Sequence, residues 1–399
     1  MKNWIAAAAL GAALAAAPAI APEAAAREYG APLQVEPGQT YAISLDMHEV
    51  IGSAEQNIDI SGSQVYRLDI LPNNRWRYTP VTFTYGDMQA LGVPVEVPPR
   101  AMQAMGEGVS AFFRIAADIG FECTVDAYGR CVSWSNWPTW SARVENLVLM
   151  ADAFARYGIA MSQSGEDEVV YGDEVDETSD AEGGMAERDP TKMWLKMREP
   201  VLQSVALFLD GITSESAASA MSTFHPAAAV QGRVMERGVA QRFAEEWTMP
   251  FGAPPILVSG ELTLERVNSR ANTGEFVRRS TVDADSVRAA LRAMANTLAN
   301  DVLAPVRPML EEQGADADEL LNMVDEILPQ VGLEFVETTR GTVDLSTGMA
   351  RETATQLHIV ITPPANAESE AASEPITVDL TYTLNIEPGA PETPRLPRP

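Results

Sequence analysis

Two long stretches of this chain alternate apolar and polar residues with the two-residue period of β-strands, and short clusters rich in Gly, Pro and Asn separate the alternating segments. The segments are residues 41–50, 63–70, 76–85 and 111–134 in the first stretch, and 256–268, 275–282, 334–345, 349–361 and 376–386 in the second. Helical patterns lie between these blocks and do not follow every strand. The order therefore predicts an α+β fold with antiparallel strands, and excludes the regular βαβ alternation of a parallel sheet.

The segments between the strands carry amphipathic helix patterns with apolar residues at three- and four-residue spacing. The predicted helices are residues 99–106, 144–157, 190–209 with a kink or break at Pro200, 213–221, 239–247, 287–303 after an Asp283 cap, and 316–328. Two strand-rich blocks, 40–158 and 256–386, are each associated with helices. Their residue identity is too low to indicate an internal repeat.

The two cysteines, Cys123 and Cys131, flank turn residues from Asp126 to Gly129 within a predicted β-hairpin. Opposite positions on the two arms are compatible with a cross-strand disulfide in an oxidising compartment. A redox pair is disfavoured because it usually has Cys-x-x-Cys spacing, and a structural zinc site is disfavoured because it requires four ligands.

The N-terminus has the features of a secretory leader: Lys2, an apolar run over residues 4–17, and small residues at two cleavage positions, Ala19 and Ala26. We expect residues 1–26 to be a signal peptide. No later stretch reaches the roughly 20 apolar residues that a transmembrane helix needs, so we expect no membrane span in the mature chain. The expected location is the periplasm, with the extracellular medium as the alternative.

The formal net charge of −28 disfavours nucleic acid and anionic membrane surfaces as direct partners, because both need a basic face. Residues 165–189 hold eleven carboxylates and one Arg, a composition typical of a solvated linker. A calcium site is the alternative for this run, but the Asp-x-Asp-x-Asp-Gly spacing is absent. The expected organisation is a strand-rich lobe at 27–160, an acidic linker at 161–190, a helical and strand-rich lobe at 191–386, and a Pro-rich disordered tail at 387–399.

Few residues suggest a catalytic, metal-binding or ligand-binding role. Trp134, Trp137 and Trp140 would share one face of an extended backbone and could form an aromatic platform for sugar rings or partner chains; the alternative is a buried Trp cluster over the hairpin. The Met pairs 102/105 and 193/197 are interpreted as packing residues and not as a copper site. The three histidines, at positions 48, 225 and 358, lack metal-ligand spacing. We therefore predict no catalytic residue, no metal and no cofactor.

The hairpin at residues 340–351, followed by a Thr-rich strand, and the 121–134 hairpin with its Asp-x-x-Gly turn resemble hairpins of secreted bacterial proteins of unknown function. In those proteins a curved antiparallel sheet cradles helices, an architecture similar to the half-barrel of lipoprotein carriers. The resemblance implies a curved, half-barrel-like sheet packed on amphipathic helices, and it implies no functional residue.

These observations favour a non-enzymatic periplasmic binding protein that holds a lipid, another apolar ligand or a hydrophobic segment of an envelope protein between sheet and helices. The first alternative is an interaction or scaffold protein whose acidic linker and Pro-rich tail engage basic partners or cell-wall components. The second is an unrecognised hydrolase, whose catalytic groups only the fold would bring together.

Overall fold

The structure is a computed structural model that describes residues 27–52, 57–90, 93–94, 114–143, 190–223, 226–308, 317–364 and 375–391. The predicted leader, the helices expected at 99–106 and 144–157, the acidic run 165–189 and most of the C-terminal tail lie outside the described residues. So do His225, Met102 and Met105.

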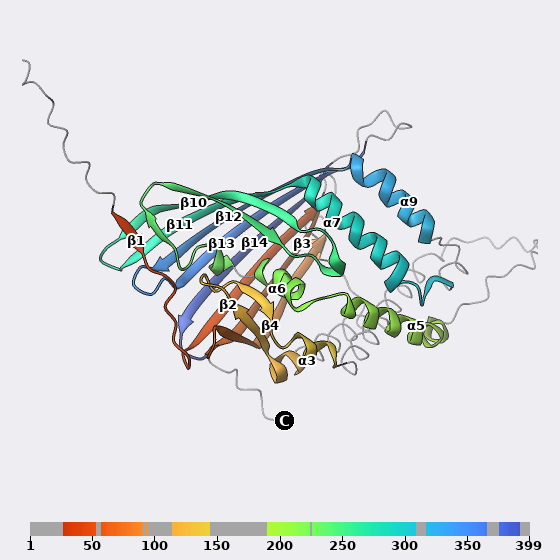
Figure 1. Ribbon diagram of the computed structural model, residues 1–399, viewed down its shortest axis with the longest axis horizontal. Helices are drawn as coiled ribbons and strands as arrows, with labels where there is room; N and C mark the ends of the chain where they lie inside the picture. The colour runs from red at the N-terminus through yellow and green to blue at the C-terminus, as the bar shows by residue number, and fades with distance from the viewer. Residues whose placement is uncertain are drawn as a thin grey trace, which may run out of the picture.

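One large antiparallel sheet dominates the described part of the chain (Figure 1). The sheet has 12 strands in the spatial order β7-β6-β4-β3-β2-β14-β13-β12-β11-β10-β9, with β5 beside β4. Its strands are β2 (Thr40–Gly52), β3 (Asn57–Leu71), β4 (Arg75–Ala90), β5 (Val93–Pro94), β6 (Phe121–Val125), β7 (Cys131–Trp134), β9 (Ala240–Trp247), β10 (Ile256–Asn268), β11 (Thr273–Val282), β12 (Gly332–Asp344), β13 (Ala350–Thr362) and β14 (Ile376–Pro388). A separate two-stranded sheet pairs β1 (Glu28–Gly30) with β8 (Val234–Glu236).

The two strand-rich blocks of the sequence form a single sheet, because β14 from the end of the chain pairs with β2 from its beginning. The register places Leu384 opposite Leu45 and Val378 opposite Ile51, an alignment that keeps the apolar residues of both strands on the same face. The predicted hairpins at 256–282 and 334–361 are confirmed as β10–β11 and β12–β13.

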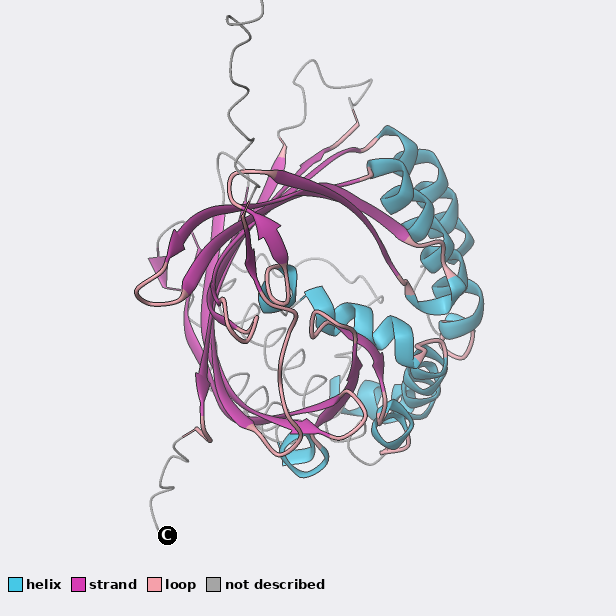
Figure 2. Cartoon of the chain, turned by 60° about the vertical axis from the view of Figure 1, so that its left-hand side comes forward, coloured by secondary structure: helices cyan, strands magenta, loops and turns pink. Residues whose placement is uncertain are grey.

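The sheet is curved and open: β7 and β9, at its two edges, do not pair with each other. Figure 2 shows it as a trough with helices along the side that the strands leave free. Register shifts interrupt four ladders within the sheet, at Ile60/Gly62 and Val65/Tyr66, Leu264/Arg266, Thr342/Val343 and Thr124/Val125. Such bulges bend a strand and increase its twist, so they contribute to the curvature. The curved antiparallel sheet expected from the resemblance is confirmed in this form.

Among the described residues, fewer belong to helices than to strands. The α-helices are α3 (Trp137–Ser141), α5 (Pro190–Asp210), α6 (Ser214–Thr223), α7 (Ala284–Thr297) and α9 (Ala317–Ile327), with 3-10 turns η1 (Pro226–Ala229), η2 (Pro250–Gly252) and η4 (Leu328–Gln330) and a π-helical turn η3 (Leu298–Val302). Asp283 caps α7 as predicted, since its side chain accepts a hydrogen bond from the Ser286 backbone N–H. Ala290 and Val287 of α7 pack against Ile256 and Val258 of β10.

Two expectations about individual segments are wrong, and a third is wrong in part. Residues 240–247, predicted as a helix, form the edge strand β9, because pairing with β10 satisfies their backbone groups. Residues 114–119, inside the predicted strand 111–134, are helical. The predicted helix at 190–209 is confirmed as α5, which continues through Pro200, so of the two alternatives given for that residue the break is wrong.

Candidate functional site on the concave face of the sheet

Alternate residues of every strand point to the concave face, and cross-strand pairing arranges them in rows that run across the sheet. At one end of the trough these rows are filled. The core there contains Leu45, Leu68, Trp76, Phe276 and Leu384 from the sheet, and Ala217 and Ala218 from α6 cover it. Val230 and Met235, which follow η1, belong to the same core. This end of the concave face is therefore closed by the protein's own side chains.

The opposite end of the concave face carries an apolar row that is less covered. The row crosses five adjacent strands, and its members are direct cross-strand partners: Ile58, Ile51, Val378, Ile359 and Phe335. A second row beyond it is formed by Ile376, Ile361 and Leu333. Ile58 is 43% exposed and Ile376 is 41% exposed, and the other members are half-buried. We name these eight residues the apolar strip.

A polar cavity of about 200 Å³ lies between the filled end and the apolar strip. Its lining comes from elements that are distant in sequence: the β6–β7 turn (Tyr128, Arg130), β7 (Cys131, Val132), α6 (Ser219), η1 (Ala228, Ala229), Arg233 before β8, β9 with the next residue (Glu245, Glu246, Trp247, Thr248), β11 (Arg278), β12 (Glu337, Thr339) and β13 (Thr355). Trp247 also contacts Phe335 of the apolar strip, with the ring centroids 6.0 Å apart. The polar cavity and the apolar strip are thus direct neighbours.

Arg278 is the central charge of the cavity wall. Its side chain is only 8% exposed, and its guanidinium donates to Glu337 Oε1 at 2.7 Å and to Glu245 Oε2 at 3.0 Å. The guanidinium also lies over the Phe243 ring, 4.4 Å from the centroid. Two carboxylates and an aromatic face compensate the desolvation of this buried cation, so Arg278 is held rigidly.

The Tyr382 hydroxyl belongs to the same concave face, two residues along β14 from Leu384. Burial raises the pKa of Tyr382, and the negative charges of Glu49 and Glu337 raise it further. The phenol therefore stays protonated at neutral pH, and Tyr382 acts there as a neutral polar side chain.

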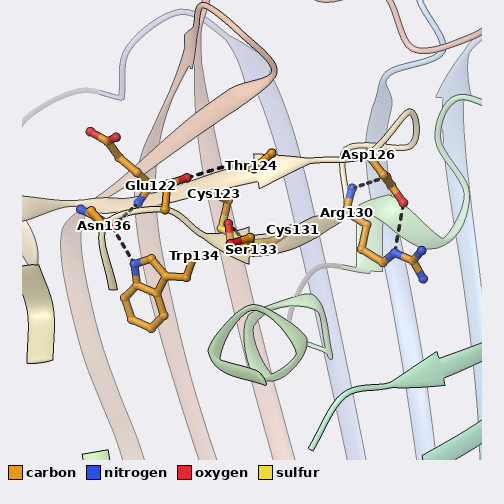
Figure 3. The surroundings of a disulfide bond; sticks show 10 residues. Glu122, Cys123, Thr124, Asp126, Arg130, Cys131, Ser133, Trp134 and Asn136 are labelled. Atoms are coloured by element: carbon orange, nitrogen blue, oxygen red, sulfur yellow. Dashed lines mark hydrogen bonds and ion pairs between the residues drawn. A yellow bond between two sulfur atoms is a disulfide. The ribbon is translucent and has the colours of Figure 1, made fainter. Parts of the chain in front are cut away.

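The β6–β7 hairpin supplies another part of the cavity wall, and its disulfide is confirmed. The two cysteines are not direct cross-strand partners as expected, because a register shift pairs Cys131 with Val125 and Cys123 with Trp134. Cys123 and Cys131 are bonded and buried, with Cα atoms 5.3 Å apart. Figure 3 shows Arg130 turned back toward Asp126, whose Oδ2 accepts from Arg130 Nε at 3.1 Å. The bridge pins the two arms, and the turn between them places Tyr128 and Arg130 at the cavity.

The three tryptophans after the hairpin form a cluster, and the extended backbone expected for them is wrong because Trp137–Ser141 is helix α3. Trp134 lies with ring centroids 5.0 Å from Trp137 and 5.5 Å from Trp140, and Trp140 stacks on Phe121 at 4.7 Å. Their indole N–H groups donate to Asn136, Ile212 and Gly120. The cluster fixes the hairpin onto the core. A stacking role toward a sugar ring or a partner chain stays a prediction.

The two described histidines lie on the opposite, convex face. His48 contacts Asp59 at 2.8 Å and His358 contacts Asp379 at 2.7 Å, and all four side chains are substantially exposed. Within the described ranges, no group of three or more His, Cys, Asp or Glu side chains is arranged to hold a metal ion. In the same residues, no helix has the length and apolar character needed to cross a membrane.

The charged residues of the cavity are not among the site residues predicted from the sequence. One signal could have found them: Arg278 and Glu337 occupy core-facing positions of alternating strands, between Phe276 and Ser280 and between Phe335 and Thr339. A charged residue in the apolar phase of a strand indicates a buried ion pair or a polar site. Arg233 has no such signal, because it lies outside the long strands.

Comparison with known proteins identifies no family for this chain. No family model matches the chain, and no curated protein matches it. One matching solved structure is described as "Lipid-protein interactions in lipovitellin"; the TM-score is 0.36 and the sequence identity 8%, over 92% of this chain and 27% of that one. The chain thus spans only about a quarter of the length of that lipovitellin chain. We draw no functional argument from a likeness of this size.

Proposed function

We propose that this protein is a non-enzymatic binding protein that holds a lipid or another apolar ligand on the concave face of its sheet. The observation that supports the proposal is the apolar strip: eight aliphatic and aromatic side chains, contiguous across five strands, that are half-buried or exposed. A concave apolar surface with polar groups at one end is typical of small-molecule sites.

The energetics favour a chain-like apolar ligand. Each methylene group that moves from water onto such a surface contributes about 0.8 kcal/mol. The burial of apolar surface is therefore sufficient to bind an acyl chain that lies across the apolar strip. Contiguous apolar surface that is not fully covered by the protein marks an interaction site, and the apolar strip is of this kind because two of its residues are exposed and six are half-buried. The strip lies on the inner side of a trough, a shape that surrounds a narrow ligand better than it surrounds a folded protein partner.

The location that we propose is the periplasm, with the extracellular medium as the alternative. The leader-like N-terminus supports export. The disulfide between Cys123 and Cys131 is also consistent with an oxidising compartment.

The function can be tested with 11-(dansylamino)undecanoic acid, whose fluorescence rises on entering an apolar site. We expect saturable binding at micromolar concentration. The Ile359→Glu variant should lose it, because the new carboxylate would lie in the middle of the apolar strip, between Phe335 and Val378. Gln356→Glu is the matched control, since it adds the same charge to the convex face of the same strand.

Native mass spectrometry of the protein purified from its own envelope should then identify the ligand as added mass. If the wild-type protein binds no probe and carries no added mass, the binding proposal fails. An interaction or scaffold role would then take its place.

A further inference from the structure

Arg233 differs from the other two arginines of the cavity in its partners. Arg278 is paired with two carboxylates, and Arg130 lies near Asp126 and Glu245. Arg233 has no carboxylate within 4.0 Å among the described residues, and its guanidinium rests instead on the Tyr128 ring, 3.6 Å from the centroid. The Tyr128 ring is therefore its direct contact, while the carboxylates of Glu245 and Asp126 act on its charge only from beyond ion-pair distance.

The polar atoms of Arg233 are also incompletely satisfied. Its Nε is buried and has no hydrogen-bond acceptor in the described structure. Burial lowers the pKa of Arg233 and the positive charge of Arg278 lowers it further, while the opposing effects of Tyr128, Glu245 and Asp126 do not restore it. The guanidinium remains positively charged at neutral pH, since an arginine titrates far above it. A buried cationic donor without an acceptor is costly, and a bound anion would remove that cost.

The position of Arg233 makes such an anion accessible from the apolar strip. Arg233 and Trp247 line the same cavity, and Trp247 contacts Phe335 of the strip. At about 200 Å³ the cavity is smaller than the roughly 300–1,000 Å³ typical of pockets for whole drug-sized ligands. Its size therefore suits a small charged group and not an acyl chain.

We propose that the cavity binds an oxyanion, a phosphate or carboxylate group, through Arg233, and that this group is the head of the ligand whose chain lies on the apolar strip. This inference rests on the proposed function and makes it more specific. Guanidinium groups recognise phosphate and carboxylate oxygens with paired, charge-assisted hydrogen bonds. The ligand class is thus an anionic amphiphile.

The test compares three probes on the wild-type protein by isothermal titration calorimetry, below the micelle concentration: dodecyl phosphate, dodecanol and inorganic phosphate. Dodecyl phosphate should bind about tenfold more tightly than dodecanol, because only it can use Arg233. Inorganic phosphate should bind weakly. This comparison needs no variant and does not depend on any variant folding.

Two variants then assign the effect to a residue. Arg233→Gln should lose the roughly tenfold preference for dodecyl phosphate and lose inorganic phosphate binding, while its affinity for dodecanol changes by less than about twofold. Arg279→Gln is the matched control, because this substitution removes the same charge from the convex face of the sheet. The Arg279 side chain is 60% exposed there. This variant should keep the preference.

The outcomes separate the two proposals. If dodecanol and dodecyl phosphate bind equally and inorganic phosphate does not bind, the oxyanion site is overturned and the apolar site stands. If inorganic phosphate alone binds, and Arg233→Gln abolishes it, the oxyanion site stands but serves a free anion, and the lipid function fails. Binding of none of the three probes overturns both.

Discussion

Trp247 and Phe335 meet edge to face, with their planes at 72° and their centroids 6.0 Å apart, at the boundary between the polar cavity and the apolar strip. Trp247 belongs to β9, at one edge of the sheet, and Phe335 belongs to β12, three strands away in the sheet order. The sheet must curve for these rings to touch. The pair therefore connects the shape of the fold to the two chemical zones of its concave face.

The first prediction concerns this pair. Trp247→Ala should weaken binding of 11-(dansylamino)undecanoic acid by about three- to tenfold, because the indole contributes both apolar area and the contact that positions Phe335. Leu257→Ala is the control, since Leu257 lies on the adjacent strand, is 45% exposed and points away from the trough. Fluorescence titration measures both. Equal probe affinities of Trp247→Ala and the wild type would show that the Trp247 ring does not contribute to the binding site.

The strand pattern of the sequence predicts most of the sheet, because alternation is a local property. The β12–β13 hairpin and the disulfide hairpin follow from turn residues and spacing alone. In the segment that forms β9, Phe243 and Trp247 are four residues apart and the other residues are largely polar, a pattern that predicts a helix. Only pairing with β10, a contact between different segments, determines that it is a strand.

The candidate site is less predictable, because it is assembled by long-range pairing. Glu245, Arg278 and Glu337 come from three strands, and Tyr128 and Arg233 are separated by the whole of α5 and α6. No local pattern contains these contacts. The union of both strand blocks in one sheet likewise depends on the β2–β14 pairing, which joins residues more than 300 positions apart.

The second prediction concerns the disulfide. Replacing Cys123 and Cys131 together by Ala should lower the free energy of unfolding by roughly 2–3 kcal/mol, the value that loop-closure entropy gives for so short a loop. The Trp cluster and the remaining core should keep the protein folded. Urea denaturation of the double variant, and of the wild type with and without reductant, checks this. A double variant as stable as the oxidised wild type would contradict the prediction.

The third prediction concerns the buried charge cluster. Arg278→Met should destabilise the protein by about 3–5 kcal/mol, because it leaves Glu245 and Glu337 half-buried without their common partner. Arg279→Met, which removes an exposed arginine from the other face, should cost less than about 1 kcal/mol. Chemical denaturation of both variants at pH 7 gives the comparison, and equal losses of stability for the two arginine variants would contradict the prediction.

The last prediction concerns Asp344, at the end of β12 where the chain turns into β13. Burial alone would raise the pKa of Asp344, but hydrogen bonds from Ser346, Arg351 and the Thr347 backbone N–H lower it to about 2, from the ordinary 3.8 of an aspartate. Because the folded-state pKa lies below the unfolded one, the ionised carboxylate stabilises the protein above about pH 4, and this contribution disappears as the pH falls toward 2. A shift of this size corresponds to about 2 kcal/mol.

Asp344→Asn should therefore lower the free energy of unfolding by about 2 kcal/mol at pH 7, and the gap to the wild type should narrow between pH 4 and pH 2. Asp379→Asn is the control, since Asp379 is 57% exposed and its contact with His358 is on the convex surface; it should cost less than about 1 kcal/mol. Urea titrations at pH 7, 4 and 2 measure the three proteins. A gap between Asp344→Asn and wild type that stays constant over this pH range would show that the carboxylate charge does not stabilise the turn.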